Sequence, residues 1–123
     1  MDTQTYRGVV EAGEGAAFRD YNVPTANLAL NQPVILDPGV YAAMTTWRDT
    51  AYESVVCYGV GSPPKFEVHL FDVDVDMYGG TLEVEVFEKV SELIPWESKE
   101  RMRQKILHDL DLVRGYFGSV TDR

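Results

Sequence analysis

Three side chains with oxygen atoms lie at positions where the backbone could hold them in fixed orientations. Thr25 and Asn27 lie in the stretch NVPTANL at 22–28, directly after Pro24. Proline fixes its own φ at about −65° and pushes the preceding residue into extended backbone, so we expect a stiff bend. Such a bend could present a hydroxyl and an amide to a ligand, or it could be an ordinary turn in which both side chains bond locally. Glu67, in FEVHLF, is a carboxylate that could accept a proton from an alcohol.

Glycine and aromatic residues supply two further kinds of contact. Gly13 and Gly15 punctuate the loop at 11–24 and could let the backbone approach a phosphate group closely. Tyr78 and Trp96 lie beside turn residues and could stack on a flat ring. Aromatic side chains in a small β protein are more often part of the core, and that alternative applies to both.

The acidic run DVDVD raises the question of calcium. Asp72, Asp74 and Asp76, with Glu83 eleven residues after the first, match part of the spacing of an EF-hand loop. Met77 stands where that loop requires glycine, and the residues around Glu83 are typical of a strand rather than a helix. We therefore expect these carboxylates to solvate the exposed end of a strand.

These side chains need a scaffold, and the pattern of the chain predicts one made mainly of short strands. Strand signals occur over 6–10, 26–30, 39–47, 51–59, 66–71 and 81–87. In the last two segments, alternation separates an apolar face from a face that carries the carboxylates. On that pattern Glu67 lies on the face opposite the apolar one, either as a functional group or as a polar residue of a half-exposed strand.

The C-terminal part of the chain predicts a helix. Ser98 is a good N-cap residue, and Gly115 is expected to end the helix. Between them one apolar stripe recurs at spacings of four, four and three, and it consists of Met102, Ile106, Leu110 and Val113. Several short strands followed by one helix predict an antiparallel barrel or a strongly curled sheet, with the helix packed on it.

Composition excludes several classes of protein. At 123 residues the chain fits one domain, and 11 Lys and Arg against 20 Asp and Glu give a net charge of −9. That charge argues against general binding to nucleic acid or an anionic membrane, but not against a nucleotide held by backbone N–H groups and a metal ion. No apolar run reaches the ~20 residues of a membrane span, no signal peptide is evident, and the single Cys57 cannot form an internal disulfide. We expect a cytoplasmic protein.

The order of these pieces resembles the riboflavin kinase family, the flavokinases that phosphorylate riboflavin to FMN. The matching stretches are VPTANL at 23–28, PGVYA at 38–42, FEVHLFD at 66–72, DMYGG at 76–80 and WES at 96–98, which leads into RQKILHDL at 103–110. The resemblance implies a mainly β fold, a small closed antiparallel barrel of about six strands with one C-terminal helix, and a single domain over 1–123. Only five residues precede the first expected strand, so we expect no adenylyltransferase domain, and a chain that makes FMN but not FAD.

The resemblance also implies roles for the residues singled out above. Thr25 would ligate Mg²⁺ through its hydroxyl, Asn27 would help to hold the metal ion and the phosphates, and Glu67 would be the catalytic base. The substrates would be riboflavin and ATP, or another nucleoside triphosphate. Contacts to the nucleotide or the flavin would come from Gly13, Gly15, Arg19, Tyr78 and Trp96, of which Arg19 matches an arginine in the family's glycine-rich segment.

Several positions depart from the pattern of that family. Phe18 and Asn22 stand where the glycine-rich segment usually has glycine. Ser91 and Leu93 stand where the family usually has an arginine and a glutamate beside the flavin, and Pro64 replaces a threonine. These substitutions favour an alternative, a non-catalytic flavin- or nucleotide-binding barrel derived from the kinase family. A barrel that only binds protein partners would fit the acidic composition, but would leave the three oxygen-bearing side chains unexplained as a set.

Overall fold

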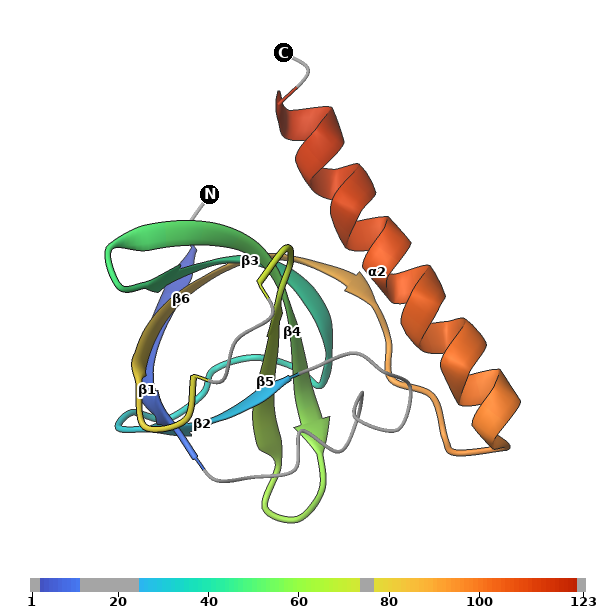
Figure 1. Ribbon diagram of the computed structural model, residues 1–123. Coiled ribbons are helices and arrows are strands. Elements are labelled where there is room, and N and C mark those ends of the chain that lie inside the picture. Colours follow the sequence, from blue (N-terminus) through green and yellow to red (C-terminus); the bar gives the residue numbers. More distant parts are fainter. Residues whose placement is uncertain (1–2, 12–24, 74–76, 122–123) are drawn as a thin grey trace.

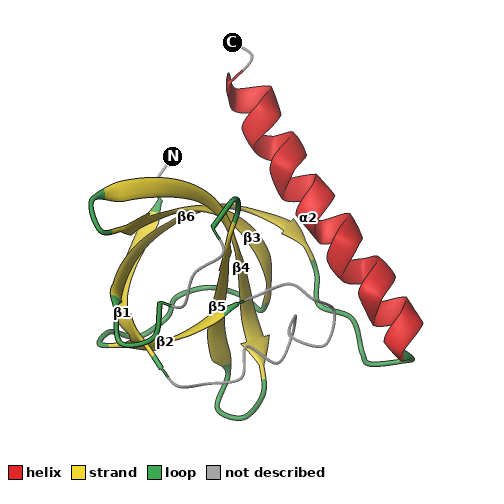
Figure 2. Cartoon of the chain, in the orientation of Figure 1, coloured by secondary structure: helices red, strands yellow, loops and turns green. Residues whose placement is uncertain are grey.

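In the described part of the chain, six strands form a closed barrel, and one helix lies on its outside (Figure 1). The computed structural model describes residues 3–11, 25–73 and 77–121. Around the barrel the strand order is β1-β2-β5-β4-β3-β6, neighbouring strands are antiparallel, and β6 pairs with β1 to close the ring. The strands are β1 (Gln4–Val10), β2 (Ala26–Leu30), β3 (Gly39–Trp47), β4 (Thr50–Val60), β5 (Lys65–Leu70) and β6 (Thr81–Ser91). This confirms the predicted fold class and all six predicted strands, of which β6 runs further than expected (Figure 2).

The barrel interior is filled by the apolar faces that alternation predicted. Because successive side chains of a strand point to opposite faces, every second residue of β5 and β6 enters the core. These residues are 4% exposed or less, and they are Phe66, Val68, Leu70, Leu82, Val84 and Val86. The residues between them face outward, so β5 places the side chain of Glu67 on the outside of the barrel.

Helix α2 (Lys99–Thr121) packs on the outer faces of β3, β4 and β6. Its start is capped as predicted, since Ser98 Oγ accepts a hydrogen bond from the backbone N–H of Arg101 at 3.1 Å. The predicted stripe faces the barrel: Ile106 and Val113 are buried, while Met102 and Leu110 are partly buried. The helix therefore turns this part of the barrel's outer surface into a second apolar layer, in which Val113 and Phe117 pack with Val40, Ala42 and Val55.

The predicted end of the helix at Gly115 is wrong, because the helix continues to Thr121. A glycine inside a helix costs about 1 kcal/mol relative to alanine. The residues beyond it offset that cost: Phe117 is buried among Val113 and the barrel side chains, and burying a Phe side chain contributes about 1.5–3 kcal/mol. Phe117 lies four positions after Val113, so the apolar stripe runs past the glycine.

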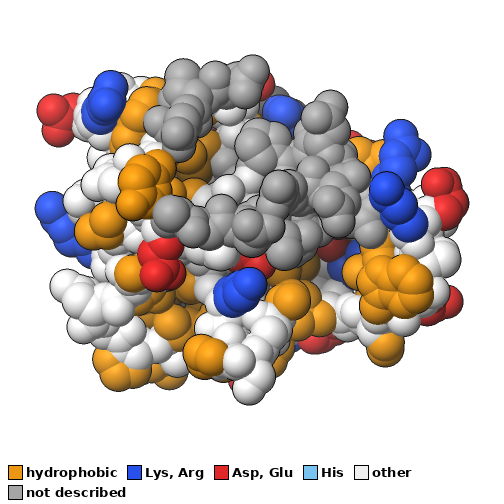
Figure 3. Space-filling model, turned by 60° about the horizontal axis from the view of Figure 1, so that its bottom comes forward, with side chains coloured by type: hydrophobic (Ala, Val, Ile, Leu, Met, Phe, Trp, Pro, Cys, Tyr) orange, Lys and Arg blue, Asp and Glu red, His pale blue; other side chains and the backbone are white. Residues whose placement is uncertain are grey.

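The surface mixes charge and apolar area. On the coloured part of the face in Figure 3, Lys and Arg alternate with Asp and Glu, and hydrophobic side chains lie between them. The net charge of −9 is therefore not gathered into one acidic field on that part of the face. None of the helical segments that the structure describes is long and apolar enough to cross a bilayer.

Candidate functional site

Strand pairing brings together the three oxygen-bearing side chains that the sequence pointed to. Asn27 of β2 lies directly opposite Glu67 of β5 in the antiparallel register, and opposite residues project to the same face of a sheet. Thr25 immediately precedes β2, and its Oγ1 donates a hydrogen bond to Glu67 Oε2 at 3.3 Å. A hydroxyl, an amide and a carboxylate thus share one patch on the outside of the barrel.

The burial of Glu67 excludes the ordinary interpretation of a polar residue on a half-exposed strand. Its side chain is 1% exposed, although it lies on the outer face of β5. Glutamate is almost never fully buried unless it is paired, and taking a carboxylate out of water is costly without hydrogen bonds. The burial of this carboxylate beside Thr25 therefore indicates a chemical role or a structural role. Simple exposure to solvent does not account for it.

The side-chain amide oxygen of Asn27 is available to bind a ligand. Its Oδ1 is buried and accepts no hydrogen bond from any residue in the described ranges. Buried polar atoms are nearly always paired, so an exception points to a missing partner such as water, an ion or a ligand. Together with the Thr25 hydroxyl it forms a set of hard oxygen donors, the kind that Mg²⁺ prefers. The residues present therefore fit the metal ion that the resemblance implies.

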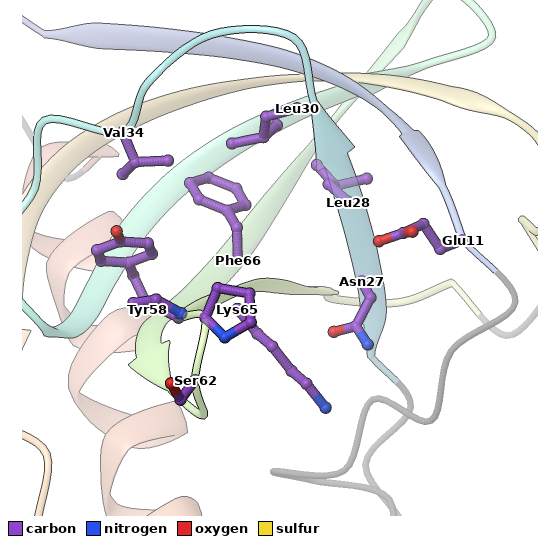
Figure 4. A pocket seen from close by; sticks show the side chains of 11 residues that line it. Glu11, Asn27, Leu28, Leu30, Val34, Tyr58, Ser62, Lys65 and Phe66 are labelled. Atoms are coloured by element: carbon purple, nitrogen blue, oxygen red, sulfur yellow. The ribbon is translucent and has the colours of Figure 1, made fainter.

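A pocket opens beside Asn27 (Figure 4). Its volume is about 380 Å³. Glu11, Asn27 and Lys65 bring polar ends to one side of the pocket, while Val34 and Phe66 line an apolar side. A pocket of this size with a few polar groups on an apolar lining is typical of a small-molecule site. Of the three oxygen-bearing side chains Asn27 lines this pocket, which provides space for a ligand next to the residue that pairs with Glu67.

Cys57 of β4 lies on the other side of Glu67. The two residues are opposite each other in the register of β4 and β5, and Cys57 is buried against Ile106 of the helix. Burial, which is the largest cause, and the nearby carboxylates of Glu67 and Asp109 together raise the pKa of the Cys57 thiol to about 12, against the lowering effect of Lys105. The thiol is therefore neutral at physiological pH and acts as a small apolar side chain.

The position at which the resemblance implies an arginine, Ser91, has a cation beside it after all. Lys105 Nζ donates hydrogen bonds to Ser91 Oγ at 2.6 Å and to Asp109 Oδ2 at 2.5 Å. Both members of this ion pair are buried. Leu93, at the position of the implied glutamate, packs against Cys57 and Ile106 instead. Side chains of the helix therefore contact both substituted positions.

The sequence pattern did not single out Lys105 and Asp109. The only available signal is that opposite charges stand four positions apart beside the apolar stripe, and most such pairs on helices are exposed and contribute little. Nothing local distinguishes this pair from an exposed one. Its importance depends on the packing of the helix against Ser91, which is 14 positions away in the chain.

The two aromatic candidates lie elsewhere. Tyr78 is 64% exposed and lines a second pocket of about 390 Å³ with Trp47 and Arg48. The turn that carries it is tied to the end of β1, since the Gly79 N–H donates to the carbonyl of Val10 at 3.0 Å. Trp96 is 71% exposed in the connection between β6 and α2, and it lines neither pocket. Their predicted contacts to nucleotide or flavin remain predictions.

Some predicted residues fall outside the described ranges. These are Gly13, Gly15 and Arg19 of the glycine-rich segment, the substituted positions Phe18 and Asn22, and two aspartates of the acidic run, Asp74 and Asp76. Within the ranges that are described, no group of three or more His, Cys, Asp or Glu residues could hold a metal ion. The metal site suggested above differs in kind, because it rests on a hydroxyl and an amide.

Comparisons with known proteins agree with this fold. The family model of riboflavin kinase, named Flavokinase, matches residues 2–117. The bifunctional riboflavin kinase/FMN adenylyltransferase of Buchnera aphidicola subsp. Acyrthosiphon pisum is 31% identical over 108 residues, which are 80% of this chain and 34% of that protein. The chain thus spans about a third of the length of the curated relatives that it matches first.

Two solved structures share the fold. The riboflavin kinase of Trypanosoma brucei has a TM-score of 0.71 at 16% identity, covering 96% of this chain and 82% of that one. A structure named as a macrolide-efflux protein of Streptococcus pneumoniae has a TM-score of 0.81 at 25% identity, covering 91% of this chain and 38% of that one. With a family model that matches nearly every residue, the chain belongs to the riboflavin kinase family.

Proposed function

We propose that this chain is a working riboflavin kinase domain, in which residues 1–123 act together to transfer the γ-phosphoryl group of ATP, or of another nucleoside triphosphate, to riboflavin. The observation that carries the proposal is the buried carboxylate of Glu67, with the Thr25 hydroxyl bonded to it and the Asn27 amide opposite it. Membership of the family supplies the reaction, and this geometry supplies side chains that suit it.

Glu67 is the proposed base. The terminal hydroxyl oxygen of the ribityl chain forms a bond to the γ-phosphorus while the bond from that phosphorus to the β,γ-bridging oxygen breaks. The hydroxyl proton passes to the Glu67 carboxylate, and the nucleoside diphosphate leaves. Phosphoryl transfer depends mainly on positioning and electrostatic stabilisation, and a carboxylate held in a buried site by Thr25 satisfies the first requirement.

Thr25 and Asn27 are the proposed holders of Mg²⁺. Mg²⁺ takes oxygen ligands and usually completes its shell with water and substrate phosphates, so two protein oxygens are enough to anchor it. When bound, the ion would neutralise negative charge on the substrate phosphates. Asn27 Oδ1, which accepts no hydrogen bond from the described part of the chain, would find its partner there.

The pocket beside Asn27 is the proposed place for the substrates. Its apolar side, with Val34 and Phe66, suits the flat surface of a ring, and Lys65 supplies a cation at the polar side. A cation there would favour the negative charge of a phosphate chain. Substrates bound in this pocket would lie next to the proposed base and metal ligands.

The test is direct assay of the purified protein. Riboflavin, Mg²⁺ and one nucleoside triphosphate at a time are incubated with it, and the flavins are separated chromatographically. We expect FMN with at least one triphosphate, and none when EDTA is added or the triphosphate is omitted. A protein that binds riboflavin in equilibrium dialysis but forms no FMN with any triphosphate would instead be the non-catalytic binding barrel.

A further inference from the structure

One row of side chains crosses the outside of the barrel from the candidate site to the helix. The register places Asn27 opposite Glu67, Glu67 opposite Cys57, Cys57 opposite Val40, and Val40 opposite Ser91. Side chains in directly opposite positions of an antiparallel sheet project to the same face. These five residues, which we call the transverse row, therefore line up across β2, β5, β4, β3 and β6.

Helix α2 lies on the far half of the transverse row. Ile106 packs on Cys57 in one buried cluster, and Val40 packs with Val113 in the next. Figure 1 shows the helix running along the outside of the barrel on this side. The helix thus covers Cys57, the residue directly opposite Glu67, and the side chain of Cys57 is only 5% exposed.

A buried polar contact ties the helix to the end of the row. Lys105, the neighbour of Ile106, donates from Nζ to Ser91 Oγ at 2.6 Å and forms an ion pair with Asp109. The side chains of the pair are 11% and 4% exposed. Among the described residues, the Lys105–Ser91 hydrogen bond is a directional polar contact between the helix and the transverse row. The apolar packing around it is not directional.

We propose that Lys105 is a positioning residue for Glu67: by binding Ser91 it seats helix α2 on the transverse row, and the seated helix holds Cys57 against the side of Glu67 that faces away from Asn27. This inference rests on the proposed function. Lys105 contacts the end of the row opposite to the candidate site, and its proposed role is to keep Glu67 in its working position.

The physical reason for this role is that a catalytic group tolerates only a small displacement. A reacting group must be held within about 0.5 Å of its productive position by neighbours that are themselves locked by packing. Glu67 has Asn27 on one side and Cys57 on the other. If the helix shifts away from the row, Cys57 loses the cover of Ile106, and the side chain of Glu67 gains conformations in which it no longer faces the substrate.

A cysteine of the chain can report on the contact between helix α2 and the transverse row. Cys57 is the only cysteine, so the rate at which a disulfide reagent such as DTNB modifies the native protein reports how often the helix uncovers it. Lys105→Met removes the ammonium and keeps the stem, and Arg103→Met is the matched control, because Arg103 is exposed on the same helix. Each variant is assayed for DTNB rate, kcat and KM.

Two further variants keep the test decisive if Lys105→Met does not fold, as loss of one partner of a buried pair can cause. Lys105→Met/Asp109→Asn removes both charges together, and Ser91→Ala removes only the acceptor on β6. Lys105→Arg restores a cation and a donor. We expect the DTNB rate to rise by about tenfold or more and kcat to fall by about tenfold in the folded variants that lose the Lys105–Ser91 bond. The KM for the triphosphate should change less, and Lys105→Arg should recover much of the loss.

Each outcome decides the proposal. A folded double variant and Ser91→Ala with wild-type kcat would overturn it, even with a faster DTNB reaction, because the seat would then have no consequence at Glu67. A fall in kcat of the same size in Arg103→Met would also overturn it. A wild-type protein that forms no FMN would refute the proposed function and this inference together, whereas wild-type FMN formation with unchanged variants refutes the inference alone.

Discussion

Replacing Glu67 with glutamine separates a kinase from a binding barrel most directly. The carboxylate is 1% exposed and accepts a hydrogen bond from Thr25. Glutamine has nearly the same size, so no cavity forms, and its amide oxygen can still accept from the Thr25 hydroxyl. Burying a neutral amide costs less than burying a carboxylate. We therefore expect a folded protein at least as stable as the wild type, with the proton acceptor removed.

The expected loss follows from the role of a base. General base catalysis contributes about 10²–10⁴-fold, which at 1.36 kcal/mol per tenfold is about 2.7–5.4 kcal/mol of transition-state stabilisation. Riboflavin and triphosphate should still bind, because the pocket and the two proposed metal ligands are unchanged. The Glu67 carboxylate also helps to raise the pKa of Cys57, so that pKa should fall in the variant. This second readout shows that the substitution acts where the structure places it.

The assay measures FMN formation by chromatography under single-turnover conditions, together with the unfolding midpoint and a spectrophotometric titration of the thiol. Glu88→Gln is the control, since Glu88 is an exposed carboxylate on β6. The reasoning is refuted if Glu67→Gln forms FMN as fast as the wild type while the pKa of Cys57 falls. The side chain would then be in its expected place without serving as the base.

Three other predictions concern the metal, the helix and the thiol. Thr25→Val keeps the shape but removes the hydroxyl, so FMN formation should fall about tenfold or more, with a folded protein by circular dichroism; wild-type turnover would contradict the metal assignment. Gly115→Ala should raise the free energy of unfolding in urea by about 1 kcal/mol, because, apart from its chain neighbours and the helix's own backbone, no atom of the described residues lies within 4 Å of an added Cβ; destabilisation would mean that the helix does not continue there. The raised pKa of Cys57, about 12 against 9.0, means that above pH 9 the unfolded chain loses this proton before the folded one. The free energy of unfolding should therefore fall with rising pH, by up to about 1.4 kcal/mol per pH unit from this group, and Cys57→Ala should reduce the slope; equal slopes would show that the thiol is not buried.

Local pattern determined much of this protein. Strand-forming residues bounded by turn residues predicted the six strands. Alternation identified the buried face of β5 and that of β6, because a residue's side of a strand depends only on its position in it. The helix start at Ser98 was equally local, since the cap is made within one turn. The closeness of Thr25 and Asn27 also followed from the sequence, because they are two positions apart. The family motifs then predicted the closed barrel, which the structure confirms, and the riboflavin kinase family, which the comparisons confirm.

Only the tertiary structure decided how these pieces meet. Thr25 and Glu67 are 42 positions apart, and their contact depends on the register between β2 and β5, which no local pattern specifies. The burial of Glu67, which alternation alone left as the polar side of a strand, likewise depends on what packs over β5. Continuation of the helix past Gly115 and the seating of Lys105 on Ser91 depend on packing against the barrel, whose free energy outweighs local propensity at the glycine. Long-range contacts of this kind are set by the closure of the barrel, and so they are absent from any short stretch of the sequence.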